Sequence, residues 1–148
     1  MTLQGRLTAD LKQALKTGDT TRRSVIRMVI AGIKNAEIAK SAPLDDAGVT
    51  DVLAKEVKQH RESIAEFSKG NRQDLVAKEE AELSIILEYL PKQISREEVV
   101  AAARRVMQQV EARGPGDKGK VMSQLMPQLK GSVDGREVSD VVSELLAG

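Results

Sequence analysis

The chain has 148 residues, a formal net charge of +1 and no cysteine or tryptophan, and His60, Phe67 and Tyr89 are the single members of their types. This length suits one domain or two small ones. The composition excludes disulfides, thiolate nucleophiles, cysteine-based zinc sites and histidine-rich metal centres. The scarcity of aromatic rings also argues against binding single-stranded nucleic acid by stacking.

No apolar run approaches the roughly 20 residues that a membrane span needs, and the N-terminus lacks the apolar core of a signal peptide. We therefore expect a cytoplasmic protein without membrane association. We also expect a monomer without a bound cofactor or metal.

Aliphatic residues at helical spacing predict four helices before residue 92, which cover about 2–17, 21–40, 46–69 and 72–89. Gly18 ends the first of these helices, Pro43 interrupts the chain after the second, and Gly70 with Asn71 ends the third. The apolar stripe predicted for the first helix is Leu3, Leu7, Leu11, Ala14 and Leu15.

The second predicted helix carries a cationic stripe on a face distinct from its apolar one. Arg23, Arg27 and Lys34 fall within about 40° of one another at helical periodicity. Residues 1–40 as a whole carry eight cations against three acids. Such a row could contact successive phosphates of a nucleic acid. The alternative is an ordinary solvated helix face.

Two titratable features of the third and fourth helices need an interpretation. His60 falls inside an apolar stripe, so we predict a hydrogen-bonded core residue. Glu79, Glu80, Glu82 and Glu88 raise the question of a carboxylate metal site, but no Glu-x-x-His motif accompanies them. We predict a solvated or salt-bridged face and no metal site.

A domain boundary is predicted at Leu90-Pro91-Lys92-Gln93, which divides the chain into residues 1–92 and 93–148. Ser95 and Glu98 form a capping-box pattern at the start of a fifth helix, which we expect to run to Arg113. Two more helices are predicted at about 117–130 and 136–146. The fold class is therefore all-α, with a four-helix part followed by a three-helix part.

A glycine-rich turn precedes the sixth predicted helix. Gly114-x-x-x-x-Gly119-Lys120 matches most of the phosphate-loop pattern, but Val121 stands where Ser or Thr is required and a helix precedes the turn, so we reject a nucleotide site. Gly116 and Gly119 would still let the backbone approach a phosphate at a helix N-terminus, with Lys118 and Lys120 adding charge. A plain helix-to-helix turn is the alternative.

Several separated segments together give the chain a family resemblance. DKGKVMSQLMPQLKGSVDGREVSDVVSELL is similar to the tail of the B subunit of the glutamine-dependent aspartyl/glutamyl-tRNA amidotransferase. RRSVIRMVIAGIKNAEI, KEVKQHRESIAEF and LEYLPKQIS resemble stand-alone proteins of the GatB/YqeY family. The resemblance covers nearly the whole chain. It implies two helical sub-domains, the second UBA-like, and a module that holds the outer corner of tRNA without doing chemistry.

The leading hypothesis is therefore a non-catalytic tRNA-binding module, with no catalytic residue in this chain. Its expected phosphate contacts are Gly116, Lys118, Gly119, Lys120, Lys130 and Arg136 in the tail, supported by Arg23, Arg27 and Lys34. One alternative is a module that docks a synthetase or an amidotransferase subunit. Another is an accessory to carbon–nitrogen ligase activity with glutamine as amide donor, which the resemblance associates with the full-length enzyme.

Overall fold

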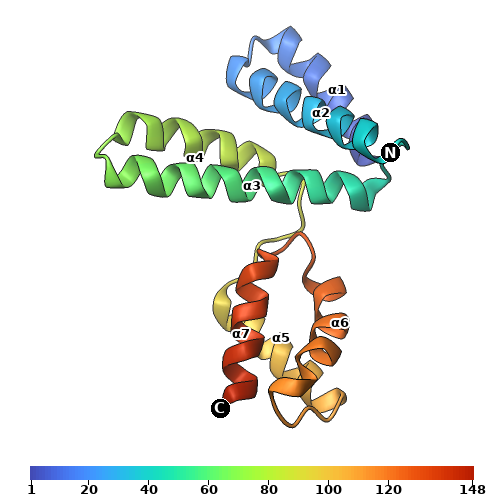
Figure 1. Cartoon of the computed structure of the whole chain (residues 1–148). Coiled ribbons are helices and arrows are strands. Elements are labelled where there is room, and N and C mark those ends of the chain that lie inside the picture. The colour runs from blue at the N-terminus through green and yellow to red at the C-terminus, as the bar shows by residue number, and fades with distance from the viewer. The chain divides into compact units, whose positions relative to one another are not determined.

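A computed structural model describes all residues from 1 to 148 and contains seven α-helices, one short 3-10 helix and no strand (Figure 1). The prediction of an all-α protein is confirmed. The chain divides into two compact units, residues 1–91 and residues 92–148. None of the helices combines the length and apolarity that crossing a bilayer would require.

The first unit begins with a hairpin of two helices, α1 (Leu3–Thr17) and α2 (Thr20–Lys40). The side chain of Thr2 accepts a hydrogen bond from the first turn of α1, and Asp19 does the same for α2. Gly18 lies between the helices in the left-handed region, with φ of 73°. This conformation, which glycine adopts at little cost, reverses the chain within two residues.

A second hairpin follows, formed by α3 (Asp46–Lys69) and α4 (Gln73–Leu87). Asn71 adopts the left-handed conformation at φ of 57°, and the Arg72 amide donates to the Phe67 carbonyl to close the turn. The buried side chains of the four helices form one aliphatic core with Tyr89. Its members are Leu7, Val25, Ile26, Val29, Ile33, Val49, Leu53, Val57, Ile85, Ile86 and Tyr89.

Polar contacts attach the end of α4 to the first hairpin. The buried Tyr89 hydroxyl donates to the Asp10 carboxylate, and the Arg6 guanidinium lies 4.6 Å above the Tyr89 ring. Arg22 of α2 forms a bidentate ion pair with Glu88, with N···O distances of 2.9 and 3.2 Å. These contacts fix the position of α4 relative to α1 and α2.

The second unit consists of α5 (Arg96–Gln109), the 3-10 helix η1 (Pro115–Asp117), α6 (Lys118–Leu129) and α7 (Gly135–Ala147). The capping box predicted at Ser95 and Glu98 is present with both of its hydrogen bonds. This unit has its own core of buried residues. They are Val99, Ala102, Ala103, Val106, Val121, Leu125, Leu129, Val138, Val141, Val142 and Leu146.

Two local predictions are wrong. α5 ends at Gln109 rather than Arg113, because Glu111 adopts a left-handed φ of 55° and the Ala112 amide donates to the Met107 carbonyl, so the helix closes before Gly114 is reached. Leu15 is 48% exposed rather than buried. At 100° per residue it lies about 80° from Leu7, which puts it at the edge of the apolar stripe.

Candidate nucleic-acid interface

The cationic stripe predicted on α2 is a row of three side chains on one helix. Arg27 and Lys34 are exposed and Arg23 is half-buried. None of the three takes part in an ion pair, so their charges are not neutralised within the chain. We call Arg23, Arg27 and Lys34 the α2 stripe.

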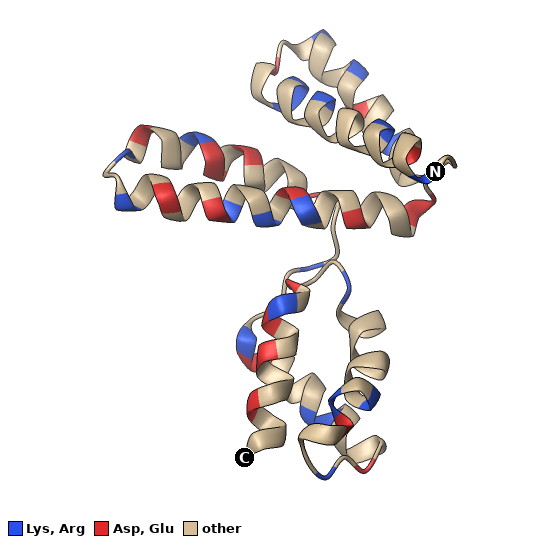
Figure 2. Ribbon diagram, viewed as in Figure 1, with Lys and Arg blue, Asp and Glu red and all other residues tan.

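The rest of the first hairpin is also cationic. Of the eight lysines and arginines in residues 1–40, only Arg22 forms an ion pair, with Asp19 and Glu88. Figure 2 shows that acidic residues are sparse on α1 and α2 and interleaved with basic ones on α3 and α4. The first hairpin therefore carries an excess of positive charge, and the one acid outside it that forms an ion pair with it is Glu88.

A shallow pocket of about 220 Å³ opens beside Lys34 between α1 and α2. Gln4, Thr8 and Glu37 supply its polar groups, and an apolar floor lies beneath them. The Glu37 carboxylate accepts hydrogen bonds from the Leu44 amide at 2.9 Å and from the Gln4 side chain at 3.4 Å. The pocket is therefore lined by one acidic and one basic side chain, Glu37 and Lys34.

The glycine-rich turn of the second unit contains an acidic side chain, Asp117. The Asp117 carboxylate accepts a hydrogen bond from the Arg113 amide at 2.8 Å. That bond, together with one from the Gly114 amide and the nearby charge of Lys120, lowers the pKa of Asp117 below its usual value. A phosphate that approached the start of α6 would therefore meet a carboxylate as well as lysines.

The predicted anchor residues at this turn remain accessible. Lys120 is exposed and Lys118 is half-buried. Gly116 and Gly119 have open space where a Cβ would stand, and neither has a positive φ. Neither packing nor backbone conformation therefore requires glycine at these two positions, so both would allow a ligand to come close to the main chain.

The structure does not bring all four tail cations together. Lys118 and Lys120 lie in the first turn of α6, whereas Lys130 follows its last residue and Arg136 lies in the first turn of α7. Twelve residues of helix separate the two groups by about 18 Å. The tail therefore has two cationic sites, one at each end of α6.

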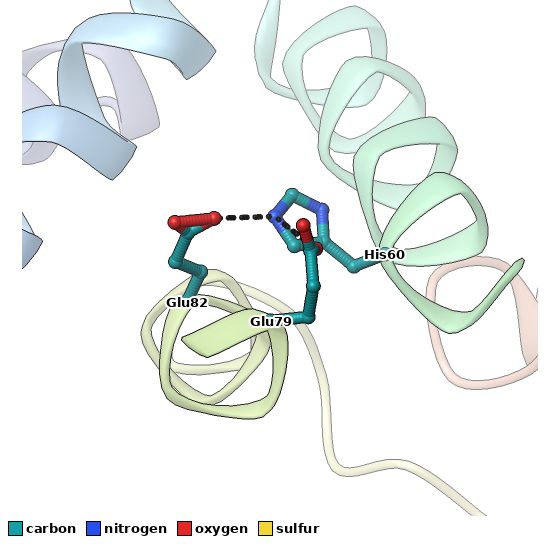
Figure 3. A group of neighbouring side chains, drawn as sticks. All are labelled: His60, Glu79 and Glu82. Carbon is teal, nitrogen blue, oxygen red and sulfur yellow. Dashed lines mark hydrogen bonds and ion pairs between the residues drawn. The ribbon is translucent and has the colours of Figure 1, made fainter. Parts of the chain in front are cut away.

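Side-chain pairs formed between distant residues were missed by the sequence analysis. His60 is a buried, hydrogen-bonded core residue as predicted, but its ring also faces Glu79 and Glu82 of α4 (Figure 3). The pairing of Arg22 with Glu88 was likewise not predicted. For the group of His60, Glu79 and Glu82, the only signal in the sequence is that the two glutamates are three residues apart and so share a helix face.

The protein is thus all-helical, with a cationic first hairpin and a small three-helix second unit. The family model described as "Yqey-like protein" matches residues 4–146. The chain therefore belongs to the Yqey-like family.

Several similar proteins carry the name "Altered inheritance of mitochondria protein 41, mitochondrial". That of Kluyveromyces lactis is 42% identical over 113 residues, which is 74% of this chain and 60% of the relative. That of Lachancea thermotolerans is 45% identical over 57% of this chain and 46% of the relative. That of Pyrenophora tritici-repentis is 30% identical over 95% of this chain and 79% of the relative. The matches to the first two relatives thus span about half of their length.

The prediction of a cytoplasmic location is contradicted, because these relatives are named as mitochondrial proteins. The prediction relied on the missing apolar core of a secretory signal. Mitochondrial targeting segments are amphipathic and rich in arginine and serine rather than apolar, so that criterion does not address them.

Proposed function

We propose that this chain is a non-catalytic RNA-binding protein that grips the backbone and shape of tRNA. The observation that carries the proposal is the first hairpin, in which seven of eight cations lack an acidic partner. Phosphate contacts of this kind position a nucleic acid without reading its sequence. Double-stranded RNA is recognised largely in this way, because its deep major groove hides the base edges.

In this proposal the α2 stripe supplies the main row of phosphate contacts. Successive members are about one or two helical turns apart, and their side chains are long enough to follow a backbone. Lys118 and Lys120, with the open backbone at Gly116 and Gly119, supply a second contact in the other unit. Lys130 and Arg136 supply a third at the opposite end of α6.

The choice of tRNA among RNAs rests on the resemblance of residues 117–146 to the amidotransferase tail. The proposed role is support of tRNA-dependent amidotransfer or aminoacylation by a partner enzyme. The chain itself would supply binding and no catalytic group.

Binding of the purified chain to total tRNA across a salt series tests the proposal. We expect affinity to fall steeply with salt, because each neutralised phosphate contributes about 0.7–0.9 to the slope of log K against log salt concentration. The triple variant Arg23→Ala, Arg27→Ala, Lys34→Ala should bind more weakly and lower the slope by about 2–3. Lys118→Ala with Lys120→Ala should lower it by about 1–2.

The matched control is Lys55→Ala, Arg61→Ala, Lys78→Ala, which removes three exposed charges without ion pairs from the second hairpin. Its binding and slope should stay close to those of the unmodified chain. Equal losses in the control and in the α2 stripe variant would show a diffuse charge effect. No binding at low salt would overturn the proposal.

Docking of a synthetase or an amidotransferase subunit is the second candidate, and it has less support. The exposed large hydrophobic side chains are Met1, Leu15, Met28 and Ile38, all in the first unit, so the three-helix unit offers no such side chain for an apolar contact. Recovery of such a subunit on immobilised chain after nuclease treatment would favour docking. An accessory role in carbon–nitrogen ligation would follow from either form of binding.

A further inference from the structure

The second hairpin contains a group of three side chains whose acceptor atoms converge (Figure 3). His60 projects from α3 towards Glu79 and Glu82, which lie three residues apart on α4. Its Nε2 atom is 3.3 Å from Glu82 Oε1 and 3.5 Å from Glu79 Oε2. The three atoms all lie within 4.8 Å of one another.

The other ring nitrogen fixes the tautomer of His60. Nδ1 lies 2.8 Å from the Glu56 carbonyl oxygen, which has no hydrogen to give. Nδ1 must therefore carry the proton and donate it. In a neutral imidazole this leaves Nε2 as a bare lone pair.

No side chain that faces this lone pair is a hydrogen-bond donor. The His60 side chain is only 7% exposed, and both groups that face Nε2 are carboxylates, which are acceptors when ionised. Three acceptors that converge around a buried imidazole repel one another, and a positive charge between them removes that repulsion. The bridging charge can be a proton on Nε2 or a metal ion.

The geometry points to a metal. In a tetrahedral zinc site with bonds of 2.0–2.1 Å, neighbouring ligand atoms are about 3.3–3.4 Å apart. The two separations from Nε2 are within about 0.2 Å of that value, and the two carboxylates, whose oxygens lie within 4.8 Å of each other, can approach an ion by side-chain rotation. A backbone carbonyl that holds the second ring nitrogen is also the usual outer partner of a metal-bound histidine, because it orients the ring and fixes its tautomer.

We propose that His60, Glu79 and Glu82 form a site for one divalent transition-metal ion of the zinc class. The two carboxylates neutralise the ion, and the imidazole selects it over calcium or magnesium, which prefer oxygen ligands alone. Glu79 and Glu82 remain 21% and 17% exposed, so water can enter as the fourth ligand. The bound ion would join α3 to α4 in the middle of the second hairpin.

Calorimetric titration of the chelator-treated full chain with zinc chloride tests the proposal. We expect one ion per chain, a rise in the midpoint of thermal unfolding, and visible absorption typical of tetrahedral coordination when cobalt replaces zinc. Glu79→Gln and Glu82→Gln should each weaken binding by more than about tenfold, since even outer-sphere changes cost 10–100-fold.

Glu80→Gln is the matched control, because Glu80 lies exposed on the same helix outside the group and loses the same charge. Its binding should be unchanged. His60→Gln should also abolish binding, and the two glutamate variants keep the proposal testable if that variant fails to fold. Failure to bind zinc, with a protonated His60 ring in the nuclear magnetic resonance spectrum, would show that a proton alone bridges the group and would overturn the proposal. Unchanged zinc affinity in Glu79→Gln and in Glu82→Gln would overturn it equally.

Discussion

Tyr89 makes two of the polar contacts between the end of α4 and the first hairpin. The residue is 5% exposed, its hydroxyl donates to Asp10, and the Arg6 guanidinium lies over its ring. Tyr89→Phe keeps the ring but leaves the half-buried Asp10 carboxylate without that donor. Hydrogen bonds to charged groups contribute about 1.5–3 kcal/mol, so we expect a loss of that size in the free energy of unfolding.

The same residue predicts a specific dependence on pH. Burial, with the hydrogen bond to Asp10, raises the pKa of Tyr89 above its ordinary value of 10.0. Below pH 10 the folded and unfolded chains both keep the proton, so the contribution to stability is fully present. Above pH 10 the unfolded chain loses the proton while the folded chain holds it, so stability falls as pH rises. Tyr89→Phe should lack this part of the fall.

Denaturant unfolding from neutral to alkaline pH measures both effects. Tyr89 is the only tyrosine, so the absorbance of tyrosinate reports this group alone and should rise only as the protein unfolds. Ser84→Ala is the control, because its exposed hydroxyl donates only to its own helix at the Glu80 carbonyl. It should change stability by less than about 0.5 kcal/mol. A tyrosinate signal at pH 10 in the folded protein would contradict the prediction.

At the scale of the element, the helix ends show what a local sequence pattern can and cannot specify. The start of α5 was predictable because Ser95 and Glu98, three residues apart, each accept a hydrogen bond from the other's backbone amide. The end of α5 was not, because the residue in the left-handed conformation is a glutamate, whereas the pattern for a helix end asks for glycine. The Schellman closure at Glu111 is held by the Ala112 and Glu111 amides, which any sequence provides.

Glu111→Gly should therefore stabilise the second unit. The left-handed conformation costs a residue with a Cβ about 1–2 kcal/mol, and glycine avoids that cost while adding entropy to the unfolded chain. We expect a net gain of about 0.5–1 kcal/mol in chemical denaturation. Glu111→Ala removes the same carboxylate but keeps the Cβ, so it should gain nothing. Equal gains in both variants would mean that loss of the charge, not relief of the backbone, is responsible.

Candidate sites formed by residues close together in the sequence were easier to predict than sites formed by distant residues. The α2 stripe was predictable because helical periodicity alone aligns its three residues. The tail cations were chosen from the glycine-rich turn and the resemblance of the tail, and the length of α6 separates them into two groups. The His60 group joins residues 19 and 22 positions apart on two helices, so only the pairing of α3 with α4 brings it together. The sequence therefore predicts the α2 stripe, which lies on one helix, but not the His60 group, which needs the pairing of two helices.

At the scale of the whole molecule, each of the two units has a complete core built from its own helices. A unit with its own core can unfold by itself, so a mutation in one core need not lower the stability of the other. The second unit has no aromatic residue, since Phe67 and Tyr89 both lie in the first. Tyrosine fluorescence therefore follows the first unit alone, whereas far-ultraviolet circular dichroism follows the helices of both.

Leu125→Ala separates these two signals. Leu125 is fully buried in the second core, and truncation of a buried leucine to alanine costs about 2–5 kcal/mol. We expect the unfolding midpoint by circular dichroism to split, with an early phase from α5, α6 and α7, while the tyrosine midpoint stays where it is. Leu53→Ala, buried to the same degree in the first core, should shift the tyrosine midpoint instead. If Leu125→Ala shifted both signals together, the two units would unfold as one cooperative unit. The α2 stripe and the tail cations would then belong to that same unit.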